Sequence, residues 1–204
     1  MTSAELSALL VLATVSSFTP GPNTTLSTAM AANHGLRHAL RFVCAVPVGW
    51  GLLFTLCATG LGGLVVAWPP LRWGIVVLGN AYLLWLASRL WQSGSLQQAD
   101  SAKLHVGFVQ GVGLQFLNIK AWMLALAIVA GWVAGRDDAT ERTLLLLPIM
   151  VTYGFVSNLS YAVAGSMLRH WLAHGQRLLA FNRCMAGALL ATVAWLLLGL
   201  RGTP

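Results

Sequence analysis

Six long apolar stretches, almost free of charge, constrain this chain more than any other feature. They run approximately over Leu6–Ala32, Ala39–Trp68, Leu71–Trp91, Val106–Ala134, Leu144–Leu168 and Phe181–Leu200. Each is long enough for a helix that crosses a bilayer, which needs roughly 20 apolar residues. None shows the short alternating pattern of a barrel strand. Only 8% of the residues are charged, against about a quarter in soluble domains. The sequence therefore predicts an all-α membrane protein with six transmembrane helices.

Basic residues between the stretches indicate how the helices are oriented. Seven lie on or beside the first, third and fifth connections: Arg37, Arg41, Arg89, Lys103, Arg169, Arg177 and Arg183. Four lie on the other side: Arg72, Arg136, Arg142 and Arg201. Cytoplasmic connections carry an excess of Lys and Arg. We therefore expect a multi-pass protein of the bacterial inner membrane with both termini in the periplasm.

Three stretches before the third connection and three after it favour an internal repeat. An odd number of spans per half reverses the second half relative to the first. We expect one transporter domain, residues 1–204, built as a 3+3 inverted repeat of residues 1–105 and 106–204. The first and fourth helices are expected to be interrupted, because each carries a polar cluster that disturbs a helix.

The cluster in the first stretch is a helix-breaking motif. Its residues are Thr19, Pro20, Gly21, Pro22 and Asn23. The two prolines lack amide hydrogens, so the carbonyls of Ser16 and Phe18 lose their helical hydrogen bonds. Inside a bilayer such a break is tolerated only where protein or a water-filled cavity covers it. We interpret the motif as part of a substrate cavity; the alternative is a proline kink that only shapes packing.

The cluster in the fourth stretch contains a lysine near the middle of the membrane. Gln115 and Asn118 precede Lys120 in this segment, and no Asp or Glu lies inside any of the six stretches. A lysine at that depth costs roughly 2.5–3.5 kcal/mol on insertion scales, so it is rarely without a function. Lys120 must contact freed carbonyls, lose its proton or receive an anionic group from a ligand. We expect all three residues to bind substrate.

Two further polar residues complete the predicted substrate site. Tyr82 lies in the third stretch, after Asn80, and Asn158 lies near the middle of the fifth. A buried asparagine can instead join two helices by hydrogen bonds, worth about 0.6 kcal/mol on average. For Asn158 both interpretations stay open, whereas Asn80 is expected to join helices.

Several other classes of protein are disfavoured by the sequence. The formal charge of +7 is scattered between apolar stretches, without the basic stripe of a nucleic-acid-binding protein. Cys44, Cys57 and Cys184 form no C-x-x-C pair, which weakens the alternative of a thiol-redox membrane conductor. We see no catalytic set, metal-ligand cluster or phosphate-binding loop. We therefore expect no enzyme activity, no metal, no cofactor and no nucleic-acid partner.

Three sequence elements resemble the lysine-exporter (LysE/RhtB) family of amino-acid exporters. They are Phe18–Asn23, Gly79–Leu86 and Asn118-x-Lys120, in the family's order and spacing over nearly the whole chain. Ile119 stands where the family usually has proline. Leu114–Lys120 and Gly154–Asn158 look closest to the cysteine/O-acetylserine exporter branch.

The resemblance implies a secondary transporter, an antiporter that uses protons to export small neutral amino acids or derivatives. Another small metabolite or ion is the alternative cargo. The partners expected are a small amino-acid substrate and the lipid bilayer, with a homodimer as a candidate assembly.

Overall fold

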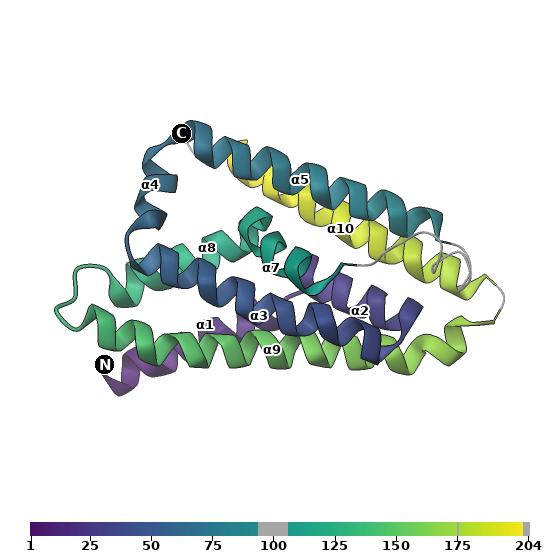
Figure 1. Cartoon of the computed structure of the whole chain (residues 1–204), viewed down its shortest axis with the longest axis horizontal. Helices are drawn as coiled ribbons and strands as arrows, with labels where there is room; N and C mark the ends of the chain where they lie inside the picture. Colours follow the sequence, from purple (N-terminus) through teal and green to yellow (C-terminus); the bar gives the residue numbers. More distant parts are fainter. Residues whose placement is uncertain (94–105, 175, 202–204) are drawn as a thin grey trace.

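The described part of the chain is built from helices, which confirms the predicted all-α class. A computed structural model describes residues 1–93, 106–174 and 176–201. The helices are α1 (Ser3–Phe18), α2 (Pro22–His34), α3 (Leu36–Ala58), α4 (Leu61–Ala67), α5 (Pro69–Gln92), α7 (Phe108–Leu117), α8 (Ile119–Ile128), the π-helical turn η1 (Val129–Val133), α9 (Ala139–Leu172) and α10 (Arg177–Arg201) (Figure 1). Lys103 and the predicted end of the first half, residue 105, lie outside the described residues.

The helices provide up to six membrane spans. Among the described residues, α3, α5, α9 and α10 are each long and apolar enough to cross a bilayer alone. The pair α1 and α2, bent by 47°, and the pair of α7 with α8–η1, bent by 68°, qualify when each pair counts as one span. Counted in this way, each predicted stretch corresponds to one candidate span, and the two bent pairs are the predicted first and fourth stretches. Outward side chains such as Val109, which is 81% exposed, suit a lipid-facing surface.

The second span is shorter than predicted. The apolar stretch continues to Trp68, but α3 ends at Ala58 and the chain turns at Gly60. Gly60 has a φ of 100°, a left-handed conformation that glycine adopts without a Cβ clash. The short helix α4 then leads to α5, which begins at Pro69. The apolar composition continues through this turn, so hydropathy alone could not locate it.

The helices pack in two groups around the broken pairs. In Figure 1, α5 and α10 lie side by side, and α2 and α3 lie close to α9. One apolar cluster joins α2, α3, α5 and α10, and a second joins α1, α3, α8 and α9. Helix α9 approaches α2 so closely that a Cβ at Gly165 would overlap the Thr28 carbonyl. This close packing holds the second half of the first span against α9.

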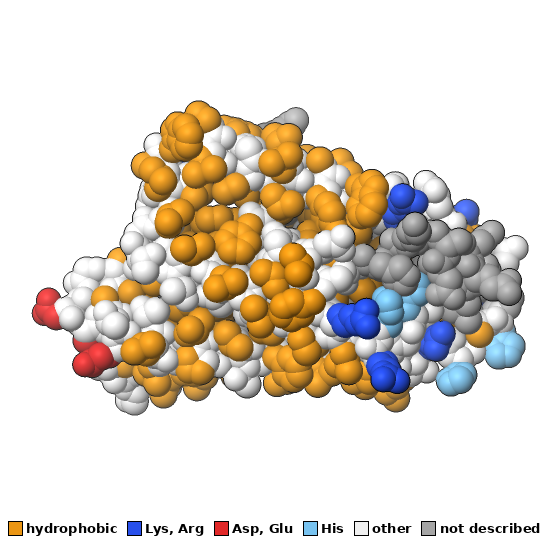
Figure 2. All heavy atoms as spheres, viewed as in Figure 1, with side chains coloured by type: hydrophobic (Ala, Val, Ile, Leu, Met, Phe, Trp, Pro, Cys, Tyr) orange, Lys and Arg blue, Asp and Glu red, His pale blue; other side chains and the backbone are white. Residues whose placement is uncertain are grey.

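Charged side chains gather at the two ends of the bundle. Figure 2 shows apolar side chains over the middle of one face, with Lys, Arg and His at the end where α3 begins and α9 ends. Acidic side chains lie at the opposite end of that face. The start of α1 and the end of α10 lie toward this second end (Figure 1). The described structure is therefore a charge-asymmetric bundle with an apolar middle.

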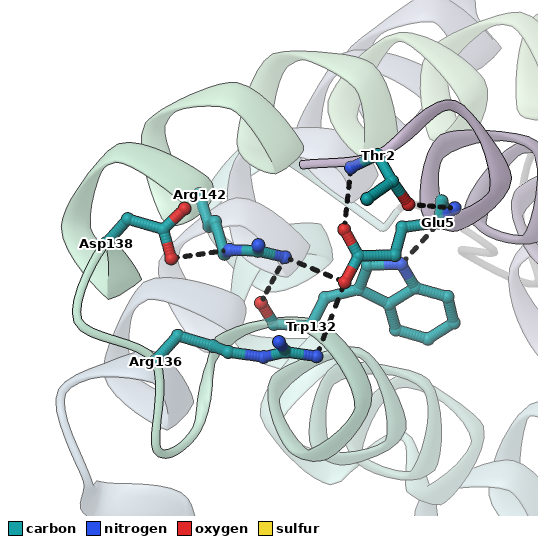
Figure 3. Close-up of polar contacts among 6 residues, drawn as sticks. All are labelled: Thr2, Glu5, Trp132, Arg136, Asp138 and Arg142. Carbon is teal, nitrogen blue, oxygen red and sulfur yellow. Dashed lines mark hydrogen bonds and ion pairs between the residues drawn. The ribbon is translucent and has the colours of Figure 1, made fainter.

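At the acidic end, a polar network ties the start of α1 to the loop before α9 (Figure 3). Arg142 Nη1 lies 3.4 Å from Glu5 Oε1, and Arg142 Nε donates to Asp138 Oδ1 at 2.7 Å. The Trp132 indole also donates to the Glu5 carbonyl at 3.0 Å. The hydrogen bond from Arg142 holds the pKa of the Asp138 carboxyl below its ordinary value. The network gives α1, which buries only Leu9 and Ala13, a polar attachment at this end.

The structure gives a reason for the glycine that begins the Gly79–Leu86 element. Gly79 lies on α5 against the break between α7 and α8, and a Cβ there would overlap the carbonyl oxygen of Leu117. Since the obstacle is backbone, no side-chain rotation can relieve the overlap. The glycine therefore lets α5 support the broken fourth span from behind.

We predict that Gly79→Ala displaces the α7–α8 break and lowers both the amount of folded protein and its transport activity. Gly74→Ala on the same helix is the matched control, because a Cβ at Gly74 has no atom within 4 Å among those considered. The measurement is the monodisperse yield in detergent together with transport into vesicles. Equal behaviour of the two variants would contradict the supporting role of Gly79.

Candidate functional site

The first broken span is formed by the two prolines of the Thr19–Asn23 motif. Helix α1 ends at Phe18 and α2 begins at Pro22, with Gly21 as its N-cap in an extended conformation. The Gly21 amide donates to the Thr24 hydroxyl at 2.9 Å instead of to a carbonyl of α1. As predicted, the prolines end the hydrogen-bond ladder and leave carbonyls without helical partners.

Side chains from other spans satisfy three of these freed carbonyls. Each carbonyl accepts from one donor: Ser17 from the Ser157 hydroxyl, Phe18 from the Tyr161 hydroxyl at 2.8 Å, and Thr19 from the Lys120 ammonium at 2.8 Å. Helix α9 supplies two of the donors and α8 supplies the third. The break is therefore held in place by polar contacts that only the folded bundle can make.

The fourth span breaks without a proline. Asn118 separates α7 from α8, and its side-chain oxygen accepts from the Lys120 amide at 3.1 Å, which is the geometry of a helix N-cap. Ile119 is the first residue of α8. It occupies the position where the family that this sequence resembles usually has proline. The cap, together with the fit of Leu117 against Gly79, supplies the break.

Lys120 connects the two broken spans. Its ammonium contacts the Thr19 carbonyl, the first of the three outcomes expected from the sequence. A Cβ at Gly21 would lie 3.2 Å from both Lys120 Cδ and Lys120 Nζ. Gly21 therefore makes room for the lysine side chain in addition to adopting the cap geometry. The ammonium is paired here with a neutral carbonyl and with no carboxylate among the described residues.

The breaks border a cavity of about 590 Å³, a volume that includes the space at its mouth. Its walls are formed by Ser16, Ser17, Thr19, Gly21, Pro22, Asn23, Thr24, Val46, Pro47, Trp50, Asn118, Lys120, Ala121, Leu124, Met150, Gly154 and Asn158. Lys120 is the one charged residue among these, and none is acidic. The cavity suits a small ligand that carries a negative group.

Most of the predicted site residues meet at this cavity. Those that line it are Thr19, Gly21, Pro22, Asn23, Asn118, Lys120 and Asn158. Pro20 does not line the cavity, and its contribution is to interrupt the helix between α1 and α2. Gln115 is fully buried behind the wall, where it exchanges two hydrogen bonds of 2.8 and 3.2 Å with the Asn23 side chain. Gln115 is thus placed to orient Asn23.

Tyr82 is the predicted site residue that the structure does not bring to the cavity. It lies on α5, half-buried against the apolar cluster that includes Leu83 and Leu86. Its ring centroid is 5.4 Å from that of Trp85. Its role in substrate binding stays a prediction that its position does not support. Neighbouring Asn80 is buried with no hydrogen-bond partner among the described residues, so the helix-joining bond expected of it is not seen.

Asn158 has both features that the sequence left open. Its side-chain oxygen accepts from the Ser27 hydroxyl at 3.0 Å, which joins α9 to α2. Its amide group donates to the Gly154 carbonyl at 2.8 Å. Asn158 also lines the cavity. It therefore joins two helices and forms part of the wall.

Several residues at the site were missed by the sequence reasoning. The second span contributes Val46, Pro47 and Trp50 to the wall, and none of them interrupts an apolar pattern strongly enough to stand out. Ser157 and Tyr161, which hold the freed carbonyls, are four residues apart in the fifth stretch. Such spacing places two hydroxyls on one helix face, a signal that could have identified them.

A helical membrane protein in which two broken spans enclose a polar, lysine-bearing cavity has the architecture of a transporter. No group of three His, Cys, Asp or Glu residues that could hold a metal ion occurs in the described part of the chain. Residues 14–200 match the family of LysE type translocators. The chain belongs to this family and is a multi-pass membrane transporter, not an enzyme.

Relatives of known description cover most of the chain. A cysteine/O-acetylserine efflux protein of Klebsiella pneumoniae subsp. pneumoniae is 30% identical over 179 residues, which span 87% of this chain and 91% of that protein. Proteins of the same description are 28% identical over 174 residues in Salmonella typhimurium, covering 85% of this chain and 89% of theirs, and 27% identical over 169 residues in Escherichia coli K12, covering 83% and 86%. No solved structure gives a significant match.

Proposed function

We propose that this transporter exports small neutral amino acids or their derivatives, of the cysteine and O-acetylserine kind, from the cytoplasm in exchange for protons. One observation carries the proposal: the described cavity wall has a single charged side chain, the Lys120 ammonium, whose partner is only a backbone carbonyl. The efflux relatives, which cover most of the chain, support the substrate class.

A substrate carboxylate is a stronger partner for Lys120 than the Thr19 carbonyl. A hydrogen bond between two charged groups is shorter and roughly twice as strong as one between neutral groups. Lys120 is half-buried, so its attraction to a carboxylate is screened less than between fully exposed groups. Asn118 and Asn23 line the same wall and offer amide donors to the second carboxylate oxygen. Lys120 then selects for a carboxylate, while the small cavity limits the side chain.

Proton exchange would involve the same lysine. No Asp, Glu or His lines the described cavity, so Lys120 is the ionisable side chain of its wall that could carry a proton. A bound carboxylate alone would favour the charged ammonium. Exchange therefore requires the loaded site to release a proton to the cytoplasm before export and the empty site to return with one.

The two interruptions favour a 3+3 inverted repeat as the framework of the exporter. They fall in the first and fourth spans, the equivalent positions of two three-span halves. In such transporters substrate binds where the broken helices of the two halves meet, and the halves move around it. Lys120 of the second half contacts Thr19 of the first. This contact joins the two broken helices at the place where such a substrate site is expected.

Transport into inside-out membrane vesicles tests the proposed function. Wild-type vesicles with an acidic interior should accumulate radiolabelled O-acetyl-L-serine, and a protonophore should abolish the accumulation. Lys120→Arg should bind the substrate but respond weakly to the gradient, because arginine scarcely releases its proton. No uptake beyond that of vesicles without the protein would contradict the function. Uptake that is indifferent to the gradient would contradict the coupling alone.

Orientation in the inner membrane follows from the charge asymmetry. The end of the bundle rich in Lys, Arg and His (Figure 2) would face the cytoplasm under the positive-inside rule, which places both termini in the periplasm. Alkaline phosphatase fused after Leu200 should be active, and green fluorescent protein fused there should be dark. A fusion after Gln92, at the end of α5, should give the opposite pattern. A fluorescent fusion after Leu200 would contradict this topology.

A further inference from the structure

A zwitterionic amino acid brings an ammonium as well as a carboxylate into the cavity. In the proposed function, Lys120 binds the substrate carboxylate, and no residue has yet been assigned to the substrate ammonium. The usual partner would be an Asp or Glu, but none lines the described cavity. An ammonium left unpaired in a partly desolvated site would cost more binding energy than the carboxylate contact returns. Some neutral acceptor in the wall has to take this role.

The Ser16 carbonyl is such an acceptor. It is one of the last four carbonyls of α1, and its helical donor would be the amide of residue 20, which is proline. The carbonyls of Ser17, Phe18 and Thr19 accept from side chains, whereas no described residue donates to that of Ser16. Ser16 lines the cavity. Ser16 is half-buried, and a backbone carbonyl in such a place normally has a partner, which a ligand in the cavity can supply.

The Trp50 ring is part of the same cavity wall. Trp50 lines the cavity and is only 8% exposed. It belongs to the same apolar cluster as Ala13, which is one helical turn before Ser16 and shares its face of α1. The indole stacks on Phe54 with ring centroids 5.3 Å apart and an interplanar angle of 8°. Its N–H has no acceptor among the described residues, so this stacking orients the ring.

We propose that the Ser16 carbonyl and the Trp50 ring form a subsite for the substrate ammonium, in the same cavity as Lys120. A carbonyl dipole and an aromatic face both attract cations, and tryptophan does so most strongly among the aromatic residues. The subsite deepens the proposed function, since it makes the transporter selective for zwitterionic amino acids over other small carboxylates. Pro20 then has a second task, because it keeps the Ser16 carbonyl free.

Two ligands that differ by one group test the subsite on the purified full-length protein. They are O-acetyl-L-serine and 3-acetoxypropanoate, the same molecule without its amino group, and their affinities are measured by isothermal titration. The wild type should prefer O-acetyl-L-serine by about tenfold or more, as expected for a desolvated cation–π contact plus a hydrogen bond. Trp50→Leu should lose about tenfold of this preference, and the ratio of the two affinities is the readout because a change in the cavity shape affects both ligands.

Pro20→Ala tests the carbonyl separately, because an alanine amide can donate to it as in a continuous helix. This variant should also lose the preference for the amino group. Trp195→Leu, exposed on α10, is the control for loss of an indole and should keep the full preference. Should Trp50→Leu fail to fold, Trp50→Phe is the second variant. Its aromatic ring attracts a cation less strongly than an indole, so its preference for the amino group should be intermediate.

The outcomes separate this subsite from the proposed function. A wild type that binds both ligands equally, or variants that keep the full preference, would overturn the subsite and leave the exporter proposal intact. Loss of the preference in only one of the two variants would overturn the joint subsite of carbonyl and ring. Binding of neither ligand by the wild type would overturn both proposals.

Discussion

The carbonyl groups that Pro20 and Pro22 free inside the membrane determine the rest of the site. In hydrocarbon each unsatisfied backbone group costs several kcal/mol, so the break exists only because the fold supplies donors to it. Ser157, Tyr161 and Lys120 are those donors. Their positions require α8 and α9 to pack at the break. The requirement to satisfy a broken backbone therefore specifies which helices meet at the cavity.

This constraint also explains how a lysine is tolerated in an apolar bundle. Lys120 follows Asn118, which caps α8, so the lysine emerges at the start of a helix and beside a carbonyl that needs a donor. The cost of placing the ammonium in the membrane is offset by hydrogen bonding to the broken span. Because that partner is neutral, the ammonium keeps its charge available for a ligand. In the proposed transporter, structural support and substrate recognition use the same group.

The sequence predicted those features that depend on composition and on backbone chemistry. Hydropathy identified the six candidate spans because lipid contact demands apolar length. Proline chemistry located the first break together with its freed carbonyl at Phe18. The fourth break was predicted from a polar cluster although Ile119 offers no proline. Features that depend on packing between helices could not be predicted from composition. The turn at Gly60 could not be located because it lies within a continuous apolar stretch. Tyr82 was assigned to the site because its spacing does not indicate which face of α5 is turned to the cavity; in the structure it packs against an apolar cluster. Trp50 was missed for the same reason, since a tryptophan in an apolar stretch is unremarkable until its neighbours are known.

The central claim is that Lys120 binds the substrate carboxylate, and the affinity of the purified Lys120→Met variant for O-acetyl-L-serine tests it most directly. Methionine preserves the length and apolar character of the side chain and removes the charge. Lys103→Met, which alters the only other lysine of the chain, is the matched control. The account predicts wild-type affinity in the control and loss of measurable binding in Lys120→Met. Wild-type affinity in Lys120→Met would contradict it.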